Sequence, residues 1–373
     1  MIRIATIGTS TISDCLIEVL NENPRATYVG TLSRDAERAK AFTRDHGGSR
    51  AFTSLDELAS CPDVDAVYIG SPNACHRAQA LACIAGGKHV LVEKPFCANR
   101  REAAEVFSAA EAAGVVALEA MRPVHDPAFH ALREALPELG RLRRATLRFG
   151  KYSSRYDDVL AGRHTNIFDC AMASGALMDI GVYTVEPLVE LFGMPESIAF
   201  AAAMLDESTR AVTNGPLDGA GVLMARYPGM VATSHYSKVT NDLAESQFEG
   251  ELGTLTVDAI STPGHARVDL RVSKGADTVG YSGISTSTRE LDLPHVSNSM
   301  AYELDDFVAA IAAVQAGATP LQAQAGPFGT VEHFRDLTLD TMELMDEARR
   351  QAGIVFPADE ADVAHATDHA PRN

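Results

Sequence analysis

The sequence predicts an α/β protein: an N-terminal Rossmann-type, doubly wound parallel sheet, followed by a second α/β domain with a large, open, mostly antiparallel sheet. Three observations support this prediction. Apolar runs alternate with helical segments over the first 120 residues, strand-like runs then follow one another with few helices between them, and helical periodicity returns near the C-terminus. A chain of 373 residues is long enough for two domains.

The first domain is predicted over residues 1–122. Its strand-like runs are short and apolar, as strands buried on both faces of a parallel sheet should be. The predicted strands are residues 2–7, 28–32, 66–69, 89–92 and 115–118, and the predicted helices are residues 12–21, 35–46, 76–85 and 101–113.

The second domain is predicted over residues 123–356. Gly-containing turns separate several of its strand-like runs, which favours antiparallel pairing. The predicted strands are residues 144–149, 198–204, 222–227, 230–235, 246–249, 254–257 and 267–272, and the predicted helices are residues 299–314 and 330–350. Residues 357–373 are polar and are expected to form a flexible tail.

Composition excludes several classes of protein. The formal net charge of −18 disfavours direct contact with nucleic acid or anionic membranes. No run of residues has the length and apolarity of a membrane span, and the N-terminus does not resemble a signal peptide, so a cytoplasmic location is expected. Six cysteines without CxxC spacing are interpreted as buried apolar residues, and no metal site is predicted, including at the tail pair His365 and His369.

A turn typical of dinucleotide binding follows the first predicted strand. Such a site needs a tight bend and a helix N-terminus whose free N–H groups face the pyrophosphate. Gly8 provides the bend, while Ser10 and Ser13 replace the second and third glycines of the Gly-x-Gly-x-x-Gly pattern, so a plain strand-to-helix turn is the alternative. The cofactor-binding candidates here are Gly8, Thr9, Ser10, Thr11 and Ile12.

Residues after the second strand indicate which dinucleotide is bound. Ser33 and Arg34 stand where NAD-binding proteins have an acidic residue for the ribose 2′-hydroxyl, and a guanidinium beside a hydroxyl suits a 2′-phosphate. NADP is therefore favoured. NAD stays possible because a shift of one residue would bring Asp35 to the ribose.

Two later strand ends carry further candidates at the sheet edge where open α/β sheets bind ligands. Ser71, Pro72, Asn73 and His76 follow one strand, and the block from Glu93 through Lys94 to Pro95 follows the next. Both are expected to lie near the nicotinamide. His76 has an alternative role as the start of a helix without cofactor contact.

These segments resemble the Gfo/Idh/MocA oxidoreductases, named for glucose-fructose oxidoreductase, inositol dehydrogenase and a rhizopine-catabolism protein. The matching segments are residues 71–76, residues 85–95 (AGGKHVLVEKP), residues 174–183 (SGALMDIGVY) and residues 248–255 (FEGELGTL). The resemblance implies a Rossmann domain, a substrate domain whose open sheet joins a homodimer or homotetramer, and a cis peptide bond at Lys94-Pro95. Tyr183 stands where the family more often has His, which resembles the NADP-preferring branch with glucose-fructose oxidoreductase and dimeric dihydrodiol dehydrogenases.

Hydride transfer at a carbonyl also needs a group that exchanges a proton with the carbonyl oxygen. Tyr183 suits this role, Lys94 would supply the ammonium that favours a phenolate and stabilises an alkoxide, and Asp179, one helical turn before Tyr183, would hold a substrate hydroxyl or pair with Lys94. Arg122 is assigned to the cofactor site, with substrate contact or pairing with an acid as alternatives. The other open roles are a surface position for Lys94, core packing for Tyr183 and helix capping for Asp179.

The sequence thus predicts an NADP-dependent oxidoreductase that acts on a secondary alcohol or carbonyl of a small-molecule sugar, polyol or cyclic diol. Residues 151–168 and 205–218 are expected to provide pocket walls, with Arg155, Asp157, Asp158, Arg163 and His164 as possible hydroxyl ligands. The alternatives are a non-catalytic dinucleotide sensor or transcriptional regulator of the same fold, and an enzyme that keeps its cofactor tightly bound.

Overall fold

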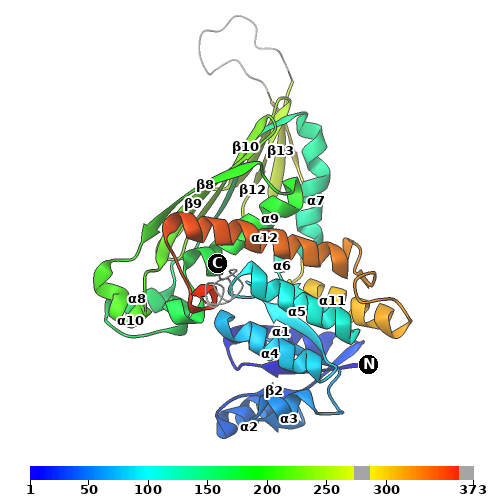
Figure 1. Cartoon of the computed structure of the whole chain (residues 1–373). Coiled ribbons are helices and arrows are strands. Elements are labelled where there is room, and N and C mark those ends of the chain that lie inside the picture. Colours follow the sequence, from blue (N-terminus) through cyan, green and yellow to red (C-terminus); the bar gives the residue numbers. More distant parts are fainter. Residues whose placement is uncertain (273–285, 361–373) are drawn as a thin grey trace, which may run out of the picture.

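The computed structural model describes residues 1–272 and 286–360. Two sheets lie one above the other, with helices packed around and between them (Figure 1). The predicted fold class is confirmed: the first sheet is parallel and the second is mostly antiparallel.

The N-terminal sheet has six strands in the order β3-β2-β1-β4-β5-β6, all parallel. Its order reverses at β1 and β4, the switch point at which doubly wound sheets bind ligands. The strands are β1 (Ile2–Ile7), β2 (Ala26–Leu32), β3 (Arg50–Phe52), β4 (Ala66–Ile69), β5 (His89–Glu93) and β6 (Ala117–Ala120). The connecting helices are α1 (Thr11–Glu22), α2 (Ala36–Asp45), α3 (Leu55–Ala59), α4 (Asn73–Ala85) and α5 (Arg100–Ala113).

The second sheet has eight strands in the order β14-β13-β12-β11-β7-β10-β9-β8. Every neighbouring pair is antiparallel except β7 and β10. Its strands are β7 (Leu142–Gly150), β8 (Ser197–Met204), β9 (Asp218–Tyr227), β10 (Met230–Ser237), β11 (Ser246–Gly250), β12 (Gly253–Val257), β13 (Ala266–Arg271) and β14 (Thr286–Glu290).

Three helices pack between or beside the two sheets, and one of them contacts both. Helix α9 (Val182–Phe192) packs on β7 and β10, and a π-helical turn at Leu177–Gly181 precedes it. Helix α12 (Val331–Ala352) contacts α9 and β8 of the second sheet as well as α5 and β6 of the first, and it crosses the middle of the molecule in Figure 1. Helix α11 (Met300–Gln315) packs on α1 and on α6 (Arg122–His125). The C-terminal helices thus complete the core of both sheets.

The structure differs from the sequence prediction at short or polar elements. Strand β6 begins two residues later than predicted, and β3, α3, α7 (Pro127–Ala135) and β14 were not predicted. The start of the predicted tail is attached to the protein, because Asp359 accepts hydrogen bonds from Arg349 (2.6 Å) and Asn99 (3.0 Å). The pair His365 and His369 lies outside the described residues.

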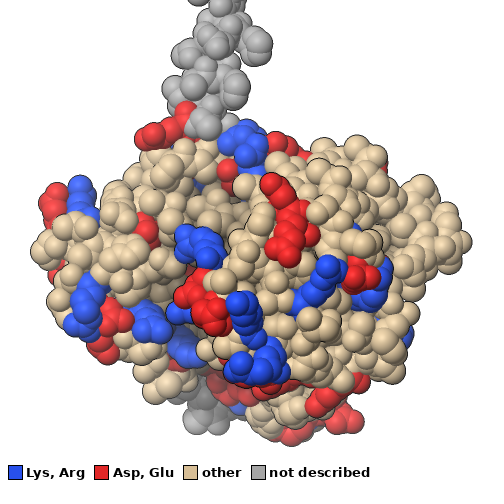
Figure 2. Space-filling view, turned by 90° about the horizontal axis from the view of Figure 1, so that it is seen from below, with Lys and Arg blue, Asp and Glu red and all other residues tan. Residues whose placement is uncertain are grey.

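The surface mixes charges of both signs. Lys and Arg side chains lie beside Asp and Glu on the face seen from the Rossmann end (Figure 2). None of the described helices is long and apolar enough to cross a membrane. All six cysteines are unpaired, four of them buried, and the described residues contain no group of three or more His, Cys, Asp or Glu side chains arranged for a metal ion.

Candidate active site

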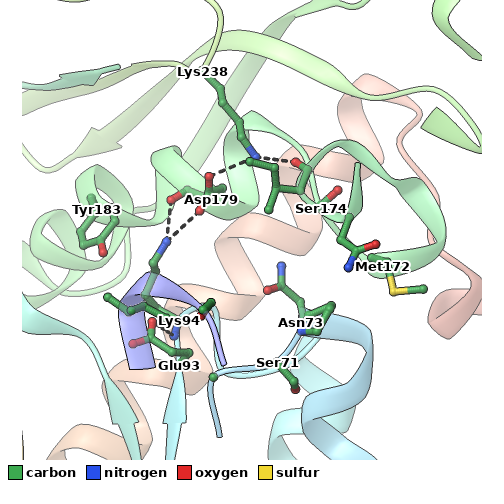
Figure 3. Close-up of a pocket in the computed structure, with 15 residues that line it drawn as sticks. Ser71, Asn73, Glu93, Lys94, Met172, Ser174, Asp179, Tyr183 and Lys238 are labelled. Atoms are coloured by element: carbon green, nitrogen blue, oxygen red, sulfur yellow. Dashed lines mark hydrogen bonds and ion pairs between the residues drawn. The ribbon is translucent and has the colours of Figure 1, made fainter. Parts of the chain in front are cut away.

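A pocket of about 440 Å³ lies between the carboxyl edge of the N-terminal sheet and the second domain. Figure 3 shows Lys94 entering from one side and Lys238 from the other, with Asp179 between them. The N-terminal domain contributes Ser10, Ile12, Gly70, Ser71, Pro72, Asn73, Glu93 and Lys94, and the second domain contributes Asn166, Ile167, Met172, Ser174, Asp179, Tyr183 and Lys238.

The dinucleotide turn has the geometry that a pyrophosphate requires. Gly8 has a φ of +112°, and a Cβ atom there would lie 2.7 Å from the carbonyl oxygen of Gly70, so only glycine fits without strain. Helix α1 begins directly after Ser10, whose side chain makes no capping hydrogen bond. First-turn N–H groups and the positive end of the helix are thus available to an anion. The residues present fit a dinucleotide.

The end of β2 presents Ser33 and Arg34 at the same sheet edge. Arg34 is exposed, and Ser33 is half-buried. Asp35 is the N-cap of α2, where one carboxylate oxygen accepts hydrogen bonds from the N–H groups of Glu37 (3.0 Å) and Arg38 (3.1 Å). A carboxylate engaged in this way is less available to a ribose hydroxyl.

Two predicted cofactor residues differ in position, because Glu93 lines the pocket and His76 lies behind it. His76 is fully buried, and its ring nitrogens contact the carbonyl oxygens of Ser71 (2.8 Å) and Pro95 (3.2 Å). Glu93 accepts a hydrogen bond from the Tyr68 hydroxyl (2.6 Å) and a longer one from the Lys94 N–H (3.3 Å). Burial lowers the pKa of His76 and raises that of Glu93. His76 therefore fixes the two strand-end loops rather than facing the pocket.

Asp179 lies between two lysine ammonium groups. Lys94 Nζ donates to Asp179 Oδ1 (2.9 Å) and to the Asp179 carbonyl oxygen (2.9 Å), and Lys238 Nζ lies 3.0 Å from Asp179 Oδ2. The peptide bond between Lys94 and Pro95 is cis, as the family resemblance implied. Asp179 forms an ion pair with Lys94, one of the two roles expected for it, and is not a helix cap.

The charges of this cluster shift its pKa values in different directions. Burial alone would raise the pKa of Asp179, but the two ammonium groups hold it well below its usual range. Burial alone would lower the pKa of Lys94, but the charge of Asp179 outweighs it and the pKa lies above its usual value. For Lys238 burial prevails and its pKa is lowered.

Tyr183 lies beside the same cluster. Lys94 Nζ is 4.6 Å from the centre of its ring, and Arg122 Nη2 donates to its hydroxyl oxygen at 3.1 Å. Arg122 does not line the pocket, so the structure places it on Tyr183 rather than among the pocket residues. Asp179 and Tyr183 both reach Lys94, although a π-helical turn separates them instead of the regular α-helix expected from their spacing.

The sequence prediction and the pocket overlap in part. Ser10, Ile12, Ser71, Pro72, Asn73, Glu93, Lys94, Asp179 and Tyr183 line it, as selected from the sequence. Asn73 also links the domains by donating to the carbonyl oxygen of Ala173 (2.8 Å). None of the side chains proposed as hydroxyl ligands, Arg155, Asp157, Asp158, Arg163 and His164, lines this pocket. Arg163 pairs with Asp158, and His164 pairs with Asp169.

Of the two segments predicted as pocket walls, residues 151–168 contribute Asn166 and Ile167, whereas residues 205–218 contribute none. The side chains Met172, Ser174 and Lys238 were not selected from the sequence as site residues. Lys238 carries no clear local signal, because the strand before it mixes apolar and polar residues.

Comparison with known proteins agrees with this geometry. Residues 2–120 match the family model described as "Oxidoreductase family, NAD-binding Rossmann fold", and residues 129–256 match the GFO/IDH/MocA C-terminal domain. The chain is 37% identical over 361 residues to scyllo-inositol 2-dehydrogenase (NADP(+)) IolU of Bacillus subtilis, covering 97% of this chain and 100% of that protein. It is 34% identical over 251 residues to human trans-1,2-dihydrobenzene-1,2-diol dehydrogenase, covering 66% of this chain and 70% of the human protein.

A solved structure of similar fold is KijD10, a 3-ketoreductase from Actinomadura kijaniata crystallised with NADP and TDP-benzene. It superimposes with a TM-score of 0.76 at 22% identity and covers 94% of this chain and 97% of that one. The two matching family models and the full-length relative show that this chain belongs to the Gfo/Idh/MocA family of oxidoreductases.

Proposed function

We propose that the protein is an NADP-dependent oxidoreductase that transfers a hydride between the nicotinamide and a secondary alcohol or carbonyl of a small polyol, sugar or cyclic diol. The observation that carries the proposal is the Lys94 ammonium, held by Asp179 next to Tyr183, in a pocket that opens on the dinucleotide turn. Relatives named for a scyllo-inositol and for a dihydrodiol support this substrate class. A sensor has no need of such a cluster.

The preference for NADP rests on the end of β2. Arg34 is exposed next to Ser33, as a 2′-phosphate ligand would need to be, while Asp35 caps α2. The IolU relative, named for NADP, supports the same choice. Gly8, Thr9, Ser10, Thr11 and Ile12 would hold the pyrophosphate, with Ser71 and Asn73 nearer the nicotinamide.

The nicotinamide, when bound, supplies or accepts the hydride, and the protein must handle the proton and the charge on oxygen. Because Arg122 donates to the Tyr183 hydroxyl oxygen, the hydrogen of that hydroxyl stays free for a substrate oxygen. Lys94 donates twice to Asp179, so a third N–H is left to stabilise an alkoxide. Tyr183 is thus the proton donor in the reducing direction, and the reverse reaction uses the same groups.

Self-association forms part of the proposal. The face of the second sheet that points away from α9 carries exposed apolar side chains, including Val222 (37% exposed), Met224 (47%) and Val231 (40%). Exposed apolar side chains on an open sheet favour an interface between copies. We expect a homodimer or homotetramer.

Tyr183→Phe tests the reaction. The variant should bind NADPH as the wild type does, because the dinucleotide turn is untouched, yet kcat should fall about 100-fold or more for loss of the proton donor. Inositols, aldoses and dihydrodiols are assayed by NADPH absorbance in both directions, with NAD in parallel. Tyr227→Phe is the control, since that hydroxyl bonds the Gly193 carbonyl outside the pocket.

Full activity of Tyr183→Phe would remove Tyr183 from the mechanism. Absence of turnover in the wild type with every substrate and both coenzymes would contradict the proposed function as a whole.

A further inference from the structure

Lys238 is a buried ammonium group that the reaction described above does not use. Only 1% of its side chain is exposed, yet its Nζ lies 3.0 Å from Asp179 Oδ2. The same nitrogen donates to the carbonyl oxygen of Ile167 and lies 4.4 Å above the ring of Phe168. One amine therefore joins the catalytic carboxylate to the loop that forms part of the opposite pocket wall.

The backbone around Lys238 fixes this placement. The residue follows β10, and its N–H donates to the Gly219 carbonyl at 2.9 Å, while its own carbonyl accepts from the Ser153 N–H at 2.9 Å. The chain is thus held from two sides where the side chain leaves it.

Packing alone does not explain a lysine at this position. A methionine has similar length and would fill the space beside Phe168 without a charge. Burying an ammonium costs stability unless partners compensate for lost hydration, and such costs are typical of functional sites. The lowered pKa of Lys238, caused by burial, reflects this cost.

We propose that Lys238 is a positioning residue that holds the second oxygen of Asp179, so that the carboxylate and the Lys94 ammonium bound to it stay fixed beside the pocket wall at Asn166 and Ile167. This inference rests on the proposed function. Although Lys238 lines the pocket, only 1% of its side chain is exposed, whereas 36% of the Asp179 side chain is exposed, so the lysine acts through Asp179.

The geometry explains why one lysine would not suffice. The terminal torsion of an aspartate is soft, so a carboxylate held at one oxygen can rotate. Here Lys94 binds Oδ1 and Lys238 binds Oδ2, which fixes both oxygens. Sharing one negative charge between two ammonium groups also leaves Lys94 less tightly neutralised, so more of its charge is available to a developing alkoxide.

The test is a double-mutant cycle between Lys238→Met and Asp179→Asn in the full-length protein. Lys238→Met should lower kcat about tenfold and raise KM, because both the carboxylate and the pocket wall lose a support, while the Kd for NADPH stays within about twofold. In the Asp179→Asn background the same change should have almost no further effect on kcat. Lys40→Met removes an exposed lysine that pairs with Glu37 on the surface of α2 and is the matched control.

Two further measurements separate positioning from packing. Lys238→Ala should regain activity when propylammonium is added but not when propanol is added, because only the former restores the charge. The free energy of unfolding in urea is also measured for the four proteins of the Lys238→Met and Asp179→Asn cycle, which requires no substrate. The effects of the two substitutions on this free energy should also be non-additive.

The inference would be overturned if Lys238→Met kept the wild-type kcat, or if the two substitutions were additive both in kcat and in the free energy of unfolding. It would also be overturned if propanol restored the activity of Lys238→Ala as well as propylammonium does. Lack of turnover in the wild type contradicts the proposed function alone, since the unfolding cycle still reports on the contact between Lys238 and Asp179.

Discussion

Arg122→Met tests whether the arginine acts on Tyr183 or binds the cofactor. Arg122 is half-buried at the start of α6, and its Nη2 donates to the Tyr183 hydroxyl oxygen at 3.1 Å. A hydrogen bond to a charged group contributes about 1.5–3 kcal/mol. If this bond acts mainly when charge develops on Tyr183, its loss lowers kcat by about 10- to 150-fold, at about 1.4 kcal/mol per factor of ten.

The assay compares kcat and KM for a polyol with the Kd for NADPH, measured by fluorescence titration. We expect kcat to fall while the Kd for NADPH changes less than about twofold. In a Tyr183→Phe background, Arg122→Met should add almost nothing, because the acceptor oxygen is already gone. Arg350→Met, which removes an exposed arginine paired with Glu347, is the control. A large rise in the Kd for NADPH with unchanged kcat would refute this reasoning and return Arg122 to the cofactor site.

Two further predictions concern the coenzyme and pH. Arg34→Ala should raise the Kd for NADPH about tenfold or more and leave the Kd for NADH nearly unchanged, since only NADPH carries the 2′-phosphate; an equal loss for both coenzymes would contradict the assignment. Burial raises the pKa of Glu119 from 4.5 to about 7, so the folded protein binds a proton on this carboxyl group more tightly than the unfolded chain does. The stability that this proton contributes is therefore lost as the pH rises from about 4.5 to 7. Glu119→Gln keeps the size of the side chain that accepts hydrogen bonds from Phe96 N–H and from the Thr338 hydroxyl. Between pH 5 and pH 7.5 the free energy of unfolding in urea should fall by about 2 kcal/mol in the wild type and should not show this fall in the variant. Equal pH slopes for the two proteins would disprove the assignment.

Local signals explain what the sequence could predict. Strands such as β1 and β5 consist mostly of apolar residues, and Gly8 and Lys94 follow them directly, so the ends of the strands also located these site residues. Strand β14 was missed because all five of its residues are polar and exposed, so they show no alternation. Helix α7 has a recognisable start signal in the sequence, because Asp126 caps it and a proline occupies its first position, yet the prediction did not include this helix.

Pairings across the chain could not be predicted. Nothing near Arg122 in the sequence indicates that its partner is a tyrosine 61 residues later. The same holds for Lys238, whose contact with Asp179 depends on the register of β10 beside β7 and on the π-helical turn. The sequence selected Lys94, Asp179, Tyr183 and Arg122, and the fold adds Lys238 and shows which of these side chains contact one another.

The position of α12 has a consequence for how the protein is made. Its contacts with α5 and β6 mean that the coenzyme-binding half obtains part of its apolar cover from residues 331–352. A ribosome builds the chain from the N-terminus, so this half emerges long before the helix that shields it. The nascent first domain must therefore stay partly uncovered until residues 331–352 have been synthesised, and chaperone contact during synthesis should concentrate on this uncovered surface.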